Sequence, residues 1–282
     1  MAALAALAAL ALLAASAAPA ACVPVEGAAT LWARPETRWV IVGEMHGTNE
    51  TPDAFTNLVC LAAKSRGPVI VAIEYPADMQ PVLDAWLASD GGNAARTALL
   101  AGPFWRKPMQ DGRTSVAFLR MLDRLRLMHR VGTVRSVRGF DAPWDGSDKR
   151  DRNAAMADRL TKIADTTPGL TVVLVGNFHA IVRDMSTPQG IVHPAASLLP
   201  SGKRVAIDVA GAGGSMWNCQ MEGCHLYDYG SGPTGPATIA PDTSPEHRYD
   251  AIYTLGKPFT AAEPAVPGIA DTKPLNAAAI KP

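Results

Sequence analysis

The sequence has no excess of charge of either sign, because 26 basic and 26 acidic residues give a formal net charge of zero. This balance argues against a nucleic-acid or anionic-membrane partner bound by general electrostatic attraction. The chain also lacks an HExxH motif, a zinc-type CxxC pair, a CxxCH haem-attachment motif and any internal repeat. The common zinc-protease helix and covalent haem attachment are therefore excluded.

A hydrophobic content of 48% over 282 residues is enough for a substantial core. The first 21 residues are small and apolar and end in a pattern that signal peptidase accepts, although they contain no Lys or Arg. We predict a signal peptide over residues 1–21, with a buried Ala-rich helix as the alternative. A single domain is expected over 22–260, and a disordered tail, rich in Pro and Ala, over 261–282.

The four cysteines bear on the compartment. Cys219 and Cys224 are close in sequence and are predicted to form a disulfide after export, which agrees with a periplasmic or secreted protein. Cys60 lies in an apolar helical stretch and is expected in the core. Cys22 stands where a lipoprotein carries its acylated cysteine, but the preceding residues lack the usual aliphatic side chain. Membrane attachment is expected only if Cys22 is lipidated.

Apolar, β-branched runs alternate with helical patterns along the chain. Strands are predicted at residues 38–44, 68–75, 133–141, 170–179, 203–211 and 248–256, and helices at 52–63, 77–89, 115–130 and 150–164. Runs that are almost continuously apolar are typical of parallel strands buried on both faces. We predict an α/β fold, a mainly parallel open sheet with helices on both faces. A glycine-rich loop or hairpin and other antiparallel or irregular additions are expected near the C-terminus.

Polar side chains stand at the ends of four predicted strands. Glu44 and His46 follow the first strand, Glu74 the second and Asp141 the third, and a fourth strand ends in two further candidates, Asn177 and His179. Ligands of open α/β sheets bind beyond the carboxyl ends of the strands, so we expect these residues to converge. Any one of them alone could be a helix cap or a structural histidine.

Two imidazoles and two carboxylates allow two kinds of hydrolytic chemistry. His46, Glu74 and His179 could bind a divalent metal and lower the pKa of its water. Alternatively, a carboxylate could orient His46 as a base without metal, and Glu44 or Glu74 could take that role. The sequence leaves both open.

The string GEMHGTNE, followed by a helix and a strand that ends in Glu74, resembles the opening of the erythromycin-esterase and ChaN-like superfamily, which includes the Tiki and TraB groups. RDRNAAMADRL followed by VVLVGNFHA resembles the second signature of that superfamily. The resemblance implies that His46, Glu74 and His179 line the site, together with the glutamate of the first motif, Glu44. Haem-binding members carry further histidines in the first motif, so haem is disfavoured here as a cofactor.

The same resemblance places Arg152 and Asn153 on the signature helix, where Arg152 could neutralise a carboxylate or a substrate oxyanion. An exposed, charged helix start is the alternative. The turn-rich stretch 102–115 contains Trp105 and Arg113, which could contact a substrate or belong to a packed surface loop.

The sequence thus favours an exported hydrolase of an ester, amide or peptide bond that acts on a small-molecule or peptide substrate. The alternative is an uptake lipoprotein that binds haem or another ligand without catalysis.

Overall fold

The apolar runs form one seven-stranded sheet in the computed structural model, which describes residues 21–270. The strand order is β10-β11-β7-β1-β4-β2-β3, and only β10 runs antiparallel to its neighbour. The strands are β1 (Trp39–Glu44), β2 (Val69–Pro76), β3 (Val134–Asp141), β4 (Thr171–Gly176), β7 (Arg204–Ala210), β10 (Thr238–Pro241) and β11 (Ala251–Thr254). The predicted parallel α/β sheet is therefore confirmed.

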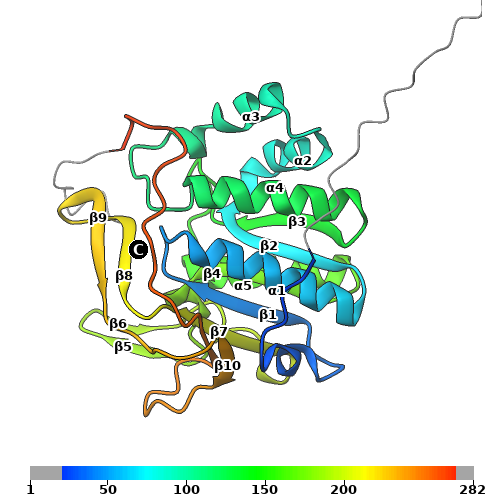
Figure 1. Ribbon diagram of the computed structural model, residues 1–282, viewed down its shortest axis with the longest axis vertical. Coiled ribbons are helices and arrows are strands. Elements are labelled where there is room, and N and C mark those ends of the chain that lie inside the picture. The colour runs from blue at the N-terminus through cyan, green and yellow to red at the C-terminus, as the bar shows by residue number, and fades with distance from the viewer. Residues whose placement is uncertain (1–20, 271–282) are drawn as a thin grey trace, which may run out of the picture.

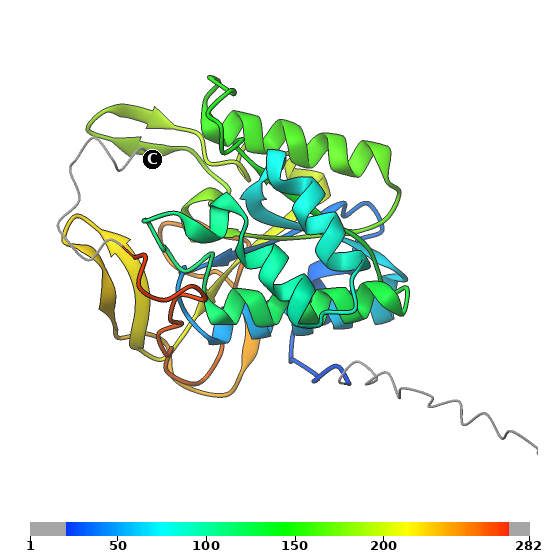
Figure 2. The same ribbon diagram turned by 90° about the horizontal axis from the view of Figure 1, so that it is seen from above.

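Helices cover both faces of this sheet, as predicted (Figures 1 and 2). One face packs against α1 (Glu50–Arg66), α2 (Gln80–Ala88), α3 (Asn93–Leu100) and α4 (Val116–Arg130), and the other against α5 (Arg152–Thr166). Short 3-10 turns join them at Ala28–Trp32, Ala77–Met79, Pro103–Arg106, Asn177–Ala180 and Ser201–Lys203. Every residue of β1, β2 and β4 is buried because both faces are covered.

Two antiparallel hairpins project on the same side of the molecule (Figures 1 and 2). One consists of β5 (Met185–Thr187) and β6 (Gly190–Val192), and the other of β8 (Gly214–Gln220) and β9 (Gly223–Gly230). The second hairpin forms the glycine-rich stretch that was expected as a loop or hairpin.

The segment after β11 is ordered further than predicted. Ala262 donates a 2.8 Å backbone hydrogen bond to Gly47, Val116 donates one of 2.9 Å to Glu263, and Ala265 donates one of 2.9 Å to Thr114. The expected disordered tail is thus wrong for its first residues, because these bonds fix the segment against the loop that follows β1 and against the start of α4. Residues 271–282 and most of the predicted signal peptide lie outside the described residues.

Two disulfides join the described cysteines. Cys219 pairs with Cys224 across β8 and β9, which is the predicted pair. Cys60 was expected as a core thiol, but it pairs with Cys22 and ties the N-terminal segment to α1. A Cys22 sulfur in this disulfide is not free for a lipid thioether, so the structure contradicts the lipid anchor. Two disulfides favour an oxidising compartment.

No helix within residues 21–270 is long and apolar enough to span a membrane.

Candidate functional site

The first motif forms a carboxylate–imidazole pair at the end of β1. Glu44 is buried, and its Oε1 lies 2.9 Å from Nδ1 of His46. The chain then turns at Gly47, where φ is +83° and an added Cβ would lie 1.6 Å from the carbonyl oxygen of Trp217. Gly47 also accepts backbone hydrogen bonds from Trp217 and Ala262. Only glycine fits this position, and its contacts fix the direction of the neighbouring imidazole.

Glu74, at the end of β2, is the centre of the site. Its Oε1 accepts hydrogen bonds of 2.6 Å from Arg113 and 2.7 Å from Arg152, and its Oε2 accepts one of 2.6 Å from the Gly176 amide. Its Oε2 also lies 3.6 Å from Nε2 of His46. Burial alone would raise the pKa of Glu74, but the charges of Arg113 and His46 outweigh burial and hold it well below the usual range.

Asp141, at the end of β3, fixes Arg152 in a bidentate pair of 2.9 and 2.8 Å. It also accepts a 3.1 Å hydrogen bond from Arg113. Asp111 holds the other side of the Arg113 guanidinium at 2.6 Å and binds Lys107 at 2.9 Å. Four carboxylates thus alternate with cationic side chains in a buried network, so each charge has an opposite partner.

The two histidines have opposite protonation preferences. Burial alone lowers the pKa of His46, but Glu74 and Glu44 outweigh burial and raise it to about 9. Burial lowers the pKa of His179 to about 4, against the opposing charge of Glu74. His179 is therefore neutral near pH 7, whereas His46 favours the imidazolium form.

Hydrogen bonds assign the tautomer of His179. Nη1 of Arg152 donates to its Nε2 at 3.1 Å, so the proton resides on Nδ1 and is donated to Oδ1 of Asn153 at 2.6 Å. The same Asn153 oxygen accepts from the Ala195 amide at 3.1 Å. Both nitrogens of His179 are thus engaged, which makes this residue a support for Arg152 rather than a free base.

Most residues predicted from strand ends and signatures meet in this network: Glu44, His46, Glu74, Asp141, Arg152, Asn153 and His179. Arg113, from the turn-rich stretch, joins them. Asn177 is different, since it contributes its backbone carbonyl to the Tyr249 hydroxyl at 3.1 Å. Trp105 is fully buried and donates to the Tyr75 hydroxyl at 3.1 Å, so its prediction as a substrate contact is wrong.

Two site residues, Gly176 and Lys107, were missed by the sequence reasoning, and Asp111 was noted only as a member of the turn-rich stretch with Arg113. Gly176 lies so close to the site that an added Cβ would be 2.9 Å from Nε2 of His46 and 3.3 Å from Oε2 of Glu74. Asp111 and Lys107 lie in the same stretch as Arg113 and neutralise one another beside it. The sequence features that could have marked these positions are Gly176 in the string VGNFH and Asp111 in the string DGR.

The predicted metal site does not fit these contacts. Within residues 21–270, no group of three or more His, Cys, Asp or Glu side chains is arranged to hold a metal ion. The physical reason is that Arg113 and Arg152 already neutralise Glu74, while Arg152 caps Nε2 of His179. A divalent cation bound to His46, Glu74 and His179 would face two guanidinium groups, so the metal ligand set is wrong.

Similarity to known proteins is seen in the fold. No protein-family model matches the chain, and no curated protein sequence is significantly similar to it. The structure of a mutant erythromycin esterase, EreC, in its open conformation aligns with a TM-score of 0.61 at 10% identity, over 81% of this chain and 92% of the esterase. The chain has an erythromycin esterase-like fold.

Two further solved structures share this fold. A succinoglycan biosynthesis protein aligns with a TM-score of 0.58 at 10% identity, over 81% of this chain and 89% of that protein. A protein from Bacillus cereus aligns with a TM-score of 0.56 at 12% identity, over 82% of this chain and 91% of that protein. The fold predicted from the two signatures is therefore confirmed, while identities this low carry no function across.

Proposed function

We propose that the protein is an exported hydrolase that cleaves an ester, amide or peptide bond of a small-molecule or peptide substrate without a metal ion. The 2.9 Å pair of Glu44 and His46 is the observation that carries this proposal. A carboxylate on Nδ1 fixes the imidazole tautomer and leaves Nε2 as the reactive atom. The two disulfides support export to the periplasm or the medium.

His46 is the general base. Its Nε2 lies 3.6 Å from Glu74, longer than an ordinary hydrogen bond. The neutral form of His46, which becomes populated as the pH approaches its raised pKa of about 9, can therefore accept a proton from water at this atom. Its side chain is 18% exposed, whereas those of Glu44 and Glu74 are 4% and 2% exposed. In the proposed reaction, water attacks the carbonyl carbon as His46 takes its proton, and the imidazolium then returns that proton to the leaving group.

Arg152 stabilises the developing oxyanion. Its guanidinium has five N–H donors, of which Nε and both donors of Nη2 bind Asp141 and Glu74. Nη1 has two donors and one partner within residues 21–270, which is His179. The remaining N–H, on a side chain that is 26% exposed, is available to a substrate oxygen.

The decisive experiment compares His46→Ala with His193→Ala, because His193 is an exposed histidine outside the site. Turnover of a panel of chromogenic esters, anilides and peptides is measured for the chain with its disulfides intact. We expect His46→Ala to lower kcat/KM by about 100-fold or more and His193→Ala to leave it unchanged. Saturable ligand binding without turnover by the unmodified chain would instead support the carrier alternative.

A further inference from the structure

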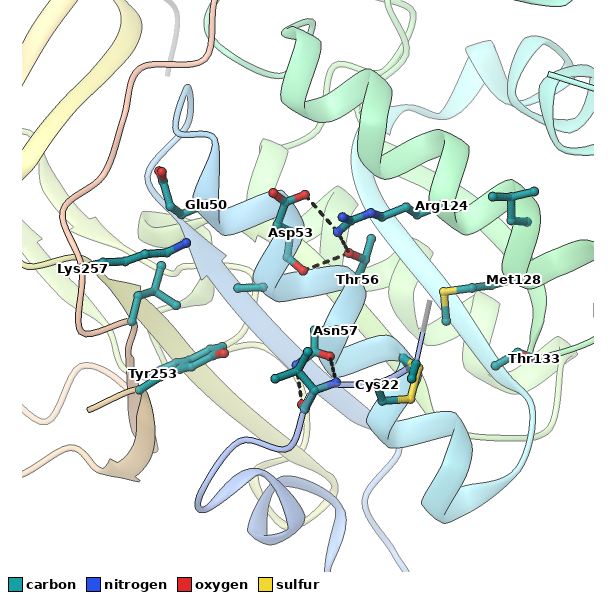
Figure 3. Close-up of a pocket in the computed structure, with 17 residues that line it drawn as sticks. Cys22, Glu50, Asp53, Thr56, Asn57, Arg124, Met128, Thr133, Tyr253 and Lys257 are labelled. Atoms are coloured by element: carbon teal, nitrogen blue, oxygen red, sulfur yellow. Dashed lines mark hydrogen bonds and ion pairs between the residues drawn. A yellow bond between two sulfur atoms is a disulfide. The ribbon is translucent and has the colours of Figure 1, made fainter. Parts of the chain in front are cut away.

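A cavity away from the candidate hydrolytic site lies along the outer side of α1, between α4 and the segment after β11 (Figure 3). Its volume of about 570 Å³ is typical of a small-molecule site. The wall is mainly apolar and includes Ala54, Leu127, Met128 and Leu255. The residues of the hydrolytic site do not line it, so any ligand here would bind independently of that chemistry.

The N-terminal segment is fixed as part of this cavity wall. Cys22 is joined to Cys60 of α1 by a disulfide. The amide of Val23 donates to Oδ1 of Asn57, and Nδ2 of Asn57 donates to the Val23 carbonyl, each at 2.8 Å. These covalent and paired contacts hold the wall in place before a ligand binds, which lowers the entropic cost of binding.

Tyr253 supplies a polar group to the cavity. The residue is 4% exposed, and its hydroxyl has no hydrogen-bond partner among the described residues. Figure 3 shows its ring extending into the pocket. Burial raises the pKa of Tyr253, so the hydroxyl remains protonated and can donate. A hydroxyl that opens into a mainly apolar pocket without a protein partner can donate its hydrogen bond to a ligand there.

Lys257 places a positive charge on the same side of the cavity as Tyr253 (Figure 3). The nearby carboxylates have other partners: Glu50 accepts hydrogen bonds from the amide and hydroxyl of Thr260, and Asp53 binds Arg120 and Arg124. Within residues 21–270, Lys257 forms no salt bridge. A ligand with an anionic end would therefore complement this side of the cavity.

We propose that this cavity binds an amphipathic carboxylate with an unbranched aliphatic chain. The carboxylate would accept hydrogen bonds from Tyr253 and pair with Lys257. The aliphatic chain would lie over α1 against Leu127, Met128 and the Cys22–Cys60 disulfide. This site is separate from the proposed hydrolase site and does not depend on hydrolysis.

Titration calorimetry of the disulfide-intact chain tests the proposal with two probes below their aggregation concentrations, dodecanoate and dodecanol. They share a chain length and differ in the charge of the head group. We expect one dodecanoate to bind per chain, with an affinity at least tenfold above that of dodecanol. Lys257→Met should weaken dodecanoate binding about fivefold or more without affecting dodecanol. Tyr253→Phe should weaken dodecanoate binding by a similar factor and dodecanol binding less, because a hydrogen bond to a charged acceptor is the stronger one.

Three comparisons make the result specific. Lys203→Met removes an exposed lysine that does not line the cavity and should bind dodecanoate normally. His46→Ala should also bind normally, which separates this proposal from the hydrolytic one. Dodecanol binding by each variant shows that its cavity is intact. If Tyr253→Phe does not fold, the Lys257→Met variant tests the proposal on its own. Equal affinity for the two probes, an unchanged Lys257→Met variant or no binding to the unmodified chain would overturn the proposal.

Discussion

The position of the His46 imidazole depends on the absence of a Cβ atom at Gly176. An added Cβ there would lie 2.9 Å from Nε2 of His46, closer than real Cβ contacts allow, so the imidazole would have to move. We expect Gly176→Ala to lower kcat/KM at least tenfold while reducing the free energy of unfolding by only about 1–2 kcal/mol. Gly202→Ala is the matched control, because an added Cβ there meets nothing within 4 Å. Equal activity of the two variants would contradict the assigned position of His46.

The raised pKa of His46 predicts an alkaline rate profile. A base must be deprotonated to act, and the folded pKa is about 9, so kcat/KM should rise with pH and level off above about 9. Glu44 is one of the carboxylates that raise this pKa. Glu44→Gln should therefore move the midpoint to lower pH while reducing the plateau. A midpoint that Glu44→Gln leaves in place would show that another group titrates.

Individual site residues could be predicted where a polar residue stands at the end of an apolar, strand-like run. Glu44 and Asp141 end strands, and Glu74 lies two residues before the end of β2. The carboxyl ends of parallel strands meet at one edge of a sheet, so the convergence of these residues follows from the fold. Gly176 and Asp111 could not be assigned in this way. Their roles depend on distances between segments far apart in sequence. Trp105 was misassigned because an aromatic residue in a loop can pack into the core as well as contact a ligand.

The two disulfides act on different elements, so their removal should have different effects. Chain-entropy arguments give about 4 kcal/mol for the 38-residue separation of Cys22 and Cys60 and about 2 kcal/mol for the 5-residue separation of Cys219 and Cys224. We expect the double serine variant of the first pair to lose more thermal stability.

Activity should show the reverse order. The β8–β9 hairpin contacts the first motif through the 2.9 Å hydrogen bond from Trp217 to Gly47. The Cys219→Ser/Cys224→Ser variant should therefore lose kcat/KM several-fold, and Cys22→Ser/Cys60→Ser should keep it when assayed below its melting temperature. Melting curves and turnover of the same samples give both readouts. Equal losses of activity would indicate general destabilisation instead of a local role for the hairpin.

Among the elements, the long helices and the strands with nearly continuous apolar runs were predicted closely, whereas the short elements α3, β5, β6 and β10 were missed. The strands β5 and β6 have three residues each and are largely exposed, so they carry no pattern that distinguishes them from a loop. Cys60 was misassigned for a related reason. A half-buried helical cysteine satisfies the core pattern equally well whether its sulfur is free or bonded to a distant segment.

The order of the strands in the sheet determines where the site forms. This order cannot be predicted from the positions of the strands along the sequence. Strand β4 is inserted between β1 and β2, which places Gly176 opposite Glu44 and brings the second signature against both glutamates. Crossover length and handedness allow several parallel orders. The convergence of the two signatures is therefore a property of the folded molecule, although each signature could be identified separately.

The stability of the whole molecule should fall on acidification in a manner that depends on His179. Its folded pKa of about 4 is below the ordinary value of 6.5, so its contribution is complete above pH 6.5 and is lost as the pH falls towards 4. We expect this loss to be about 3 kcal/mol by pH 4. His179→Gln cannot gain that proton, so its free energy of unfolding should fall less steeply between pH 7 and 4, whatever its absolute value.

Chemical denaturation at several pH values measures this slope. His193→Gln is the control, since His193 lies in an exposed pair with Asp184 and should leave the slope of the unmodified chain intact. The buried carboxylates do not affect the comparison of slopes between pH 7 and 4. Glu74 and Asp111 have lowered pKa values, so their contributions to the free energy of unfolding are lost mainly below pH 4. Both carboxylates are also present in every variant. If His179→Gln and the unmodified chain lose stability in parallel, His179 is charged in the fold, and Arg152 cannot donate to its Nε2 as the proposed site requires.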